Sequence, residues 1–400
     1  MFEEDLVKAE RPAILVGGGA YNARQAIVDF AELHRIPVFR TWNAMDVITD
    51  DSRAFCGTVG TYGGKGRNFG IQNCDLLLVL GCRLSGRITG GMPDTFARGA
   101  KIYLVEVDMG LLDPENQQRK ADVNIRMDCG EFMQNINSRY IFDNYRKLLT
   151  EESVSWFFQC WKWSRDYDPV KPEHHEQPHH YGIMRKLSNM LPANAIVTYD
   201  TGGNAIMMGH CFESKKGQRI FSSNGNSPMG FSMCGAIGAW FAEPERPVFC
   251  IIGDGGMQLN IQELQTIVHY GCNVKVIIMN NQCLGNTRAW QVQNDKAQIA
   301  CGPDGYSSPD FVAVAHAYGL LAYEYNGLPL LESWIEQPRP CVINILHPDF
   351  FDYRPRMTLW DAGIEECYPV LPEQEFLGNM LIPPLEGWRE RRTKYKEMEC

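Results

Sequence analysis

Two side chains in this sequence have the types and the spacing needed to hold a metal ion that is bound to phosphate. Asp254 follows the apolar run 248–252, and Asn281 follows the apolar run 274–279. Carboxylate and amide oxygens are ligands that Mg²⁺ prefers, and Mg²⁺ often shares its coordination with phosphate oxygens. Glycines allow backbone amides to approach those oxygens closely. The glycines beside Asp254 are Gly253, Gly255 and Gly256.

The elements that must position these two residues form a β-α-β unit. Residues 248–252 and 274–279 are short and apolar, as buried parallel strands are. Between them, Asn260 is expected to cap a helix that Gly271 ends. The apolar positions of that helix recur at helical spacing and are Ile261, Leu264, Ile267 and Val268. A right-handed crossover then brings the aspartate and the asparagine together at the carboxyl ends of two parallel strands.

This motif resembles the signature of enzymes that bind thiamine diphosphate, which is GDG, a spacer and NN. Here 24 residues separate Gly255 from Asn280, and NIQEL, VKVIIMNNQ, LG and RAWQ resemble acetolactate synthase (acetohydroxyacid synthase) in particular. The resemblance implies that thiamine diphosphate is the cofactor. It also implies that magnesium is held by Asp254, Asn281 and the backbone oxygen of Cys283. The alternative is an ordinary Rossmann-like β-α-β unit with a tight turn.

A second loop is typical of an anion site, because residues 200–204 follow a strand expected at 195–199 and open a helix. By the resemblance, the diphosphate contacts are Gly202, Gly203 and Asn204. They are expected to use mainly the backbone, since the family usually has Gln-His at the last two positions. Met229 stands where the family uses a large apolar side chain to bend the cofactor, and a core methionine is the alternative.

The expected substrate side of the site departs from the family. After LG the family usually has Met-Val, whereas this chain has Asn286 and Thr287. Asn286 is expected beside the cofactor. Thr287 and Trp290 are expected beside the substrates, because Trp290 matches the family tryptophan that selects the second keto acid; a core tryptophan is the alternative. Two polar residues favour a hydroxylated acceptor, so a sugar or a polar aldehyde competes with pyruvate.

The first third of the chain alternates strands and helices, with strands expected at 13–16, 37–39, 75–80 and 101–107. This alternation predicts a doubly wound parallel sheet. RPAILVGGGA, GTVGTYGG, DLLLVLGCR, RITGG and YLVEVD resemble, in order, the landmarks of the FAD domain of acetolactate synthase. The residues that the resemblance implies for FAD are Gly17, Gly18, Gly19, Arg83 and Asp108. Leu84, Ser85 and Gly86 stand where the family has an acidic pair, and tight strand-to-helix turns alone would need the glycines.

The chain is therefore expected to be an α/β protein with two doubly wound parallel-sheet domains. The expected divisions are a linker at 1–12, a central FAD or transhydrogenase-like domain at 13–135, a linker at 136–180, a thiamine-diphosphate domain at 181–350 and a tail at 351–400. Four histidines of the second linker lack the partner spacing of a metal site. They are His174, His175, His179 and His180.

Composition argues against several classes of function. A net charge of −10 without a basic run gives no support to nucleic-acid binding. No apolar run is long enough to cross a membrane, and an acidic start without a signal-peptide profile predicts a cytoplasmic protein. The 14 cysteines are scattered without a C-x-x-C pair, so free buried thiols are expected.

The resemblance implies decarboxylation of a 2-keto acid donor and acyl transfer to a second carbonyl acceptor. In the family, the glutamate that protonates the pyrimidine ring lies on an N-terminal domain, which residues 1–12 are too short to form. We therefore expect no catalytic residue in this chain but a separate pyrimidine-binding subunit, in a homo- or hetero-oligomer. Alternatives are a polysaccharide or branched-sugar carboligase, a decarboxylase, a truncated relative without turnover, or a non-catalytic cofactor-binding subunit.

Overall fold

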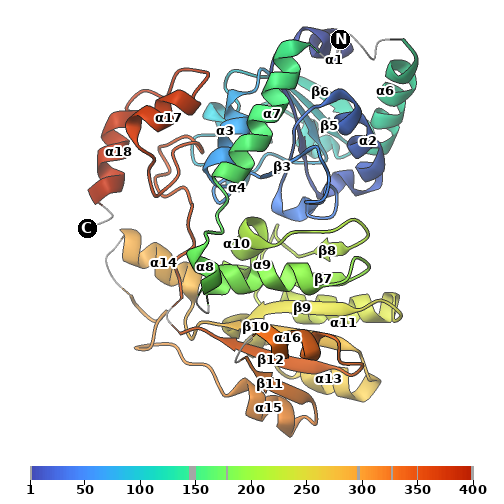
Figure 1. Cartoon of the computed structure of the whole chain (residues 1–400), viewed down its shortest axis with the longest axis vertical. Coiled ribbons are helices and arrows are strands. Elements are labelled where there is room, and N and C mark those ends of the chain that lie inside the picture. The colour runs from blue at the N-terminus through green and yellow to red at the C-terminus, as the bar shows by residue number, and fades with distance from the viewer. Residues whose placement is uncertain are drawn as a thin grey trace. The chain divides into compact units, whose positions relative to one another are not determined.

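The computed structural model describes residues 2–143, 150–176, 179–294, 298–325, 328–348 and 350–397 (Figure 1). The chain forms two compact units. The first unit consists of Met1–Pro169 together with Arg354–Cys400, and the second consists of Val170–Tyr353. Each unit is built on one six-stranded sheet whose strand pairs are all parallel. The expected fold class, α/β with two doubly wound parallel sheets, is thereby confirmed.

The sheet of the first unit has the strand order β3-β2-β1-β4-β5-β6, which is the order of dinucleotide-binding folds. Its strands are β1 Pro12–Val16, β2 Val38–Arg40, β3 Phe55–Thr58, β4 Leu76–Leu80, β5 Lys101–Glu106 and β6 Val123–Arg126. Its helices are α1 Phe2–Lys8, η1 Gly18–Ala23, α2 Arg24–His34, η2 Trp42–Ala44, α3 Lys65–Asn73, α4 Gly86–Thr89, η3 Pro93–Thr95, α5 Met109–Leu112, α6 Cys129–Asp143, α7 Glu151–Asp166, α17 Glu373–Asn379 and α18 Trp388–Glu397.

Both faces of this sheet are covered, which explains why its central strands are apolar throughout. Strand β1 directs Ile14 and Val16 into one core, beside residues of α2 and α6. It directs Ala13 and Leu15 into the other core, beside residues of α3 and α7. The alternation follows from the pleat of a strand, and burial on both faces is typical of parallel sheets.

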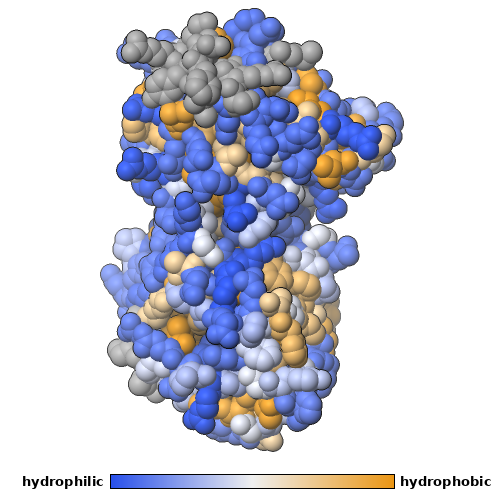
Figure 2. All heavy atoms as spheres, turned by 90° about the vertical axis from the view of Figure 1, so that its right-hand side faces the viewer, coloured by the Kyte–Doolittle hydropathy of each residue, from blue (hydrophilic) through white to orange (hydrophobic). Residues whose placement is uncertain are grey.

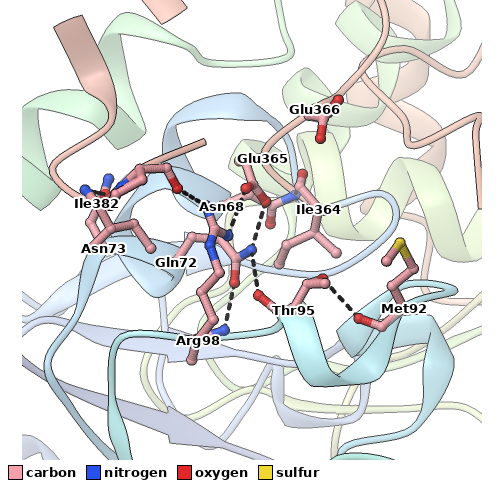
Figure 3. Close-up of polar contacts among 12 residues, drawn as sticks. Asn68, Gln72, Asn73, Met92, Thr95, Arg98, Ile364, Glu365, Glu366 and Ile382 are labelled. Carbon is pink, nitrogen blue, oxygen red and sulfur yellow. Dashed lines mark hydrogen bonds and ion pairs between the residues drawn. The ribbon is translucent and has the colours of Figure 1, made fainter. Parts of the chain in front are cut away.

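Polar side chains of α3 hold the C-terminal segment onto the first unit (Figure 3). Asn68 Nδ2 donates to the backbone oxygen of Ile364 over 2.7 Å, and Gln72 Nε2 donates to Glu365 Oε2 over 2.6 Å. Arg98 forms an ion pair with the other oxygen of Glu365 at 2.8 Å, and the Glu365 side chain has no exposed surface. Residues that are far apart in sequence therefore complete this unit.

The sheet of the second unit has the strand order β11-β12-β10-β9-β7-β8. Its strands are β7 Ile196–Tyr199, β8 Arg219–Phe221, β9 Val248–Gly253, β10 Val274–Asn280, β11 Leu321–Glu324 and β12 Cys341–Leu346. Its helices are α8 Glu173–Glu176, α9 His180–Met190, α10 Gly203–Cys211, α11 Phe231–Ala242, α12 Asp254–Leu259, α13 Glu263–Tyr270, α14 Gly285–Asn294, α15 Phe311–Ala317 and α16 Leu328–Ile335. The chain passes from β7 to β8 on one side and later to β9 on the other, so the strand order reverses at β7, where ligands of such sheets bind.

The helix between β9 and β10 differs from the sequence prediction. It is divided in two, because α12 begins at Asp254 itself and α13 begins only at Glu263. Asn260 lies between them, and its side-chain nitrogen donates to the backbone oxygen of Gly230 over 2.9 Å rather than capping a helix. Gly271 ends α13 in a left-handed conformation with φ of 66°, as expected.

No helix among the described residues is both long enough and apolar enough to span a membrane. The cysteines in the described part of the chain are free thiols, and all of these except Cys234 are buried. Burial raises the pKa of the Cys250 thiol to about 12, for example, so it stays protonated and unreactive at neutral pH.

Candidate functional site

A cavity of about 200 Å³ opens in the second unit at the carboxyl ends of β7, β9 and β10. Its lining includes almost all of the residues that the sequence analysis assigns to thiamine diphosphate, to the metal and to the substrates. Those that line it are Gly202, Gly203, Asn204, Met229, Gly253, Asp254, Gly255, Gly256, Asn281, Cys283, Asn286 and Thr287. Trp290 is not part of this lining, and 54% of its surface is exposed.

The two expected metal ligands lie side by side because β9 and β10 are neighbours in register, with Gly253 opposite Met279. Asp254 is 2% exposed and Asn281 is 6% exposed. The amide nitrogen of Asn281 donates to the backbone oxygen of Phe350 over 2.6 Å. This bond fixes the amide and leaves its oxygen for a ligand in the cavity.

Burial raises the pKa of Asp254 to about 6, against hydrogen bonds from Tyr306 and from backbone amides that lower it. The Tyr306 hydroxyl donates to Asp254 Oδ2 over 2.9 Å. Burial and the neighbouring Asp254 carboxylate raise the pKa of the Tyr306 phenol far above its ordinary value, so it remains a donor. A buried carboxylate beside an amide oxygen suits a hard divalent cation, which would compensate the buried charge.

Glycine is required where α10 begins. Gly202 precedes this helix with φ of +66°. A Cβ on Gly203 would lie 2.2 Å from the hydroxyl oxygen of Tyr353, and one on Gly253 would lie 2.9 Å from Asn204 Nδ2. The amide oxygen of Asn204 is buried without a hydrogen-bond partner, which is the kind of orphan atom that a bound ligand satisfies.

Asp200 is a site residue that the sequence reasoning did not single out. It is 1% exposed and accepts hydrogen bonds from the Thr201 amide at 2.7 Å, the Gly230 amide at 2.9 Å and the Ser232 hydroxyl at 3.0 Å. It thereby ties the loop before α10 to the loop that carries Met229. Its position directly after β7 was a signal that could have been used.

Met229 lies over the glycine turn of β9. Its terminal methyl carbon is 2.9 Å from the position that a Cβ on Gly255 would take, and the side chain is 39% exposed. It is therefore a cavity-wall residue and not a core methionine. The hydrogen bonds of Gly230 to Asp200 and Asn260 hold the loop beside it in place.

Two aromatic residues, Tyr353 and His180, also line the cavity without having been assigned to it. Burial lowers the pKa of His180 to about 3, so its ring is neutral, and its Nε2 is buried without a partner. His174 and His179 stack with ring centroids 4.1 Å apart. Among the residues that the structure describes, no three histidine, cysteine or acidic side chains are grouped so that they could hold a metal ion.

The residues implied for FAD lie in the first unit, after β1, β4 and β5. The amide of Gly17 donates to Leu80 O over 2.9 Å, and that of Gly19 donates to Gly81 O over 3.1 Å. A Cβ on Gly17 would lie 2.1 Å from Gly81 O, while Gly18 faces Asn43. Close packing of two backbone segments thus explains the glycines, and those two amides are engaged within the protein.

The other two residues of that set are at the surface. Arg83 is exposed. Asp108 caps α5, because its side chain accepts from the amide of Gly110 over 2.8 Å. Capping is a sufficient structural reason for an aspartate at this position.

Comparison with known proteins agrees with this geometry. Residues 200–345 match the family model of the thiamine pyrophosphate enzyme C-terminal TPP binding domain, and residues 4–136 match that of the central domain. The acetolactate synthase large subunit of Parasynechococcus marenigrum is 30% identical over 92% of this chain and 57% of its own length. That of Porphyra purpurea is 29% identical over 91% and 59%, and the isozyme 2 large subunit of Escherichia coli is 28% identical over 79% and 55%.

This chain thus spans little more than half the length of these relatives. The two family matches fall one in each compact unit. The chain belongs to the thiamine pyrophosphate enzymes and is a homologue of acetolactate synthase large subunits.

Proposed function

We propose that the second unit binds thiamine diphosphate through Mg²⁺ as part of a carboligase similar to acetolactate synthase. The observation that carries the proposal is the pairing of Asp254 and Asn281, two buried oxygen donors that face one cavity at the start of a helix. Mg²⁺ usually binds one or two protein side chains together with phosphate oxygens. Cys283, which lines the same cavity, is proposed to supply its backbone oxygen as the third protein ligand.

The glycine-rich starts of α10 and α12 are proposed to hold the diphosphate with backbone amides, which favour negative charge at helix N-termini. Met229 is proposed to support the cofactor from below. When bound, thiamine diphosphate supplies the carbanion chemistry for decarboxylation of a 2-keto acid. The protein's part is to hold the diphosphate, to orient the cofactor and to shape the space in front of it.

An acid that could activate the aminopyrimidine is proposed to come from a separate pyrimidine-binding subunit. Among the described residues that line the cavity, the acidic ones are Asp200 and Asp254. Asp200 already accepts several hydrogen bonds, and Asp254 is the proposed metal ligand.

Exposed apolar side chains in the second unit support assembly with another chain, because large exposed apolar residues often mark protein interfaces. They include Met229, Phe241, Leu259, Tyr270 and Trp290. Figure 2 shows one face of the molecule on which hydrophobic residues reach the surface among hydrophilic ones. A homo- or hetero-oligomer is the proposed state.

The acceptor side supports a second candidate reaction on the same scaffold. Asn286 and Thr287 line the cavity, and both are polar. Side chains of this kind can hydrogen-bond a hydroxylated acceptor. Transfer to a sugar or a polar aldehyde is therefore the alternative to transfer to a second keto acid.

FAD in the first unit is a separate proposal. The central-domain match and the strand order support a nucleotide there. The Gly17 and Gly19 amides do not support a nucleotide, since both donate to backbone oxygens within the protein. A visible absorption spectrum after incubation with FAD tests the proposal. A bound flavin band supports an FAD site, and its lack at saturating FAD removes it.

Isothermal titration calorimetry of thiamine diphosphate, with and without Mg²⁺, tests the main proposal. Wild-type protein should bind only when Mg²⁺ is present, and Asp254→Ala should abolish that binding because the metal loses a side-chain ligand. Glu336→Gln, which removes a carboxylate exposed to solvent directly after α16, is the matched control and should bind normally. Equal affinity of wild type and Asp254→Ala would remove the metal assignment.

A further inference from the structure

Tyr306 contacts Asp254, one of the two side chains proposed to hold the metal. It is not among the described residues that line the cavity, yet its hydroxyl donates to Asp254 Oδ2 over 2.9 Å. Gln258 Nε2 donates to the same hydroxyl oxygen over 2.9 Å. Because that amide hydrogen already occupies the hydroxyl oxygen, the phenol hydrogen is directed to the carboxylate.

Helix α12 presents both partners of Tyr306 on one face. Asp254 and Gln258 are four residues apart, so their side chains are neighbours one turn apart on the helix surface. Gln258 Nε2 also donates to the backbone oxygen of Ser307 over 3.2 Å. Helix α12 is therefore hydrogen-bonded to two successive residues of the neighbouring segment, Tyr306 and Ser307.

The segment that carries Tyr306 forms a compact turn. The amide of Tyr306 donates to Gly302 O over 2.8 Å, and a Cβ on Gly305 would lie 2.5 Å from the Cα of Ala300. The amide of Leu284 donates to Cys301 O over 2.9 Å. One short segment thus contacts both α12, which begins at Asp254, and Leu284, the residue after Cys283.

We propose that Tyr306 is a positioning residue that makes Asp254 a one-oxygen ligand and thereby favours Mg²⁺ over Ca²⁺ at this site. This inference rests on the proposed function. The phenol takes one lone pair of Oδ2 and competes with a cation for that oxygen, so Oδ1 of Asp254 is the oxygen more open to the cation. Asn281 offers a single oxygen as well, since its amide nitrogen donates to Phe350 O.

The preference follows from the different coordination of the two ions. Mg²⁺ is small, takes close to octahedral geometry and binds carboxylates through single oxygens. Ca²⁺ accepts six to eight oxygens at longer distances and commonly binds both oxygens of one carboxylate. A hydrogen bond to one carboxylate oxygen therefore disfavours two-oxygen binding, which Ca²⁺ uses and Mg²⁺ does not.

Tyr306→Phe is the informative variant, because it keeps the ring and removes only the donated hydrogen. Calorimetric titration of each metal into protein with excess thiamine diphosphate gives two affinities and hence a selectivity ratio. We expect the Mg²⁺ affinity to fall about tenfold or more, as for other groups that orient a metal ligand. The Ca²⁺ affinity should change by only about threefold, since Ca²⁺ gains the second carboxylate oxygen.

Tyr318→Phe, in a half-buried tyrosine of the same unit away from the cavity, is the matched control and should leave both affinities unchanged. Gln258→Met, which removes the group that directs the phenol hydrogen, should lower the Mg²⁺ to Ca²⁺ ratio in the same direction. A thermal melt of each variant establishes that it is folded.

An unchanged ratio in Tyr306→Phe overturns the proposal, as does an equal loss for both metals, which would assign Tyr306 to packing alone. If wild-type protein fails to bind thiamine diphosphate in the presence of Mg²⁺ and also in the presence of Ca²⁺, the proposed function is overturned, and the role of Tyr306 with it. Wild-type binding with an unchanged ratio in the variant overturns only the role of Tyr306.

Discussion

At the scale of single residues, the polar groups that line the cavity are of two kinds, those satisfied within the protein and those buried without a partner. Asp200 is satisfied by three protein donors. By contrast, the amide oxygen of Asn204 and Nε2 of His180 are buried without partners. An unsatisfied buried polar group costs about 1–3 kcal/mol, so a ligand that bonds to it removes a cost already present in the empty protein.

Asn204→Ala should therefore separate stability from binding. We expect the cofactor-free variant to melt at the same temperature as wild type or higher, because the unsatisfied amide oxygen is removed and only a 3.4 Å hydrogen bond from its nitrogen to Thr201 O is lost. Its affinity for thiamine diphosphate with Mg²⁺ should fall about tenfold, which is one hydrogen bond from the amide nitrogen to the diphosphate. Differential scanning calorimetry and titration calorimetry measure the two effects, with the exposed Asn194→Ala as control. A lower melting temperature with unchanged affinity would contradict a ligand role.

At the scale of elements, two helix starts border the cavity and form its proposed anion-binding face. Helix α10 begins against Tyr353, and α12 begins directly at the end of β9. A Cβ on Gly256 would lie 3.0 Å from Asp200 Oδ2, so the second start is also closely packed. Both helices therefore depend on glycine for their close packing at the cavity.

Gly203→Ala should damage both functions of the α10 start. The new methyl group would displace the Tyr353 hydroxyl, so we expect a loss of about 1–3 kcal/mol in the free energy of unfolding. Cofactor binding should weaken at the same time. Urea unfolding followed by fluorescence, together with titration calorimetry, gives both values. Gly238→Ala, where a Cβ meets nothing within 4 Å in α11, should instead stabilise by up to about 1 kcal/mol. Equal behaviour of the two variants would refute the packing explanation.

At the scale of the whole molecule, the end of the chain is part of the first unit. Glu365 is wholly buried and joins Gln72 of α3 to Arg98 (Figure 3). Nearby, Asn73 Oδ1 accepts from the amide of Leu381 over 2.8 Å. Contacts between residues about 300 positions apart thus hold the C-terminal segment in place.

Glu365→Ala should loosen that segment. It leaves Arg98 and Gln72 without their partner, and breaking a buried pair in this way typically costs about 3–5 kcal/mol. We expect lower stability in urea and faster proteolysis within residues 354–397. The control is Glu373→Ala, which removes an exposed ion pair with Arg389 at 3.2 Å and should cost less than about 1 kcal/mol. Unaltered proteolysis of Glu365→Ala would mean that other contacts hold the segment.

Catalytic activity also depends on the whole assembly. The acidic residues that line the described cavity are Asp200 and Asp254, and both already accept hydrogen bonds within the protein. We expect this chain alone to bind thiamine diphosphate but to release carbon dioxide from pyruvate at a negligible rate. Adding a separately expressed pyrimidine-binding subunit should restore the reaction by a factor of about 10² to 10⁴, the usual value of one positioned acid or base. A coupled assay for carbon dioxide measures it. Ordinary turnover by the chain alone would contradict the prediction, because a carboxylate of this chain would then have to activate the cofactor.

The sequence alone determined the fold class and the outline of the site. Apolar runs that end in Asp254 and Asn281 predict parallel strands, and parallel neighbours bring their carboxyl ends together whatever the detail of the loops. The glycines after β7 and β9 followed from the same reasoning, since close approach of backbone to phosphate needs them. Their roles in binding remain predictions until a cofactor is titrated.

Tertiary structure decided what surrounds those residues. Tyr306 reaches Asp254 across 52 positions, and Phe350 reaches Asn281 across 69, so no local pattern reveals either contact. Asn260 suits a helix cap in sequence, yet the backbone oxygen of Gly230 claims its side chain. Periodicity fixes which face of an element is buried, whereas the partner of a polar side chain depends on which distant segments pack beside it.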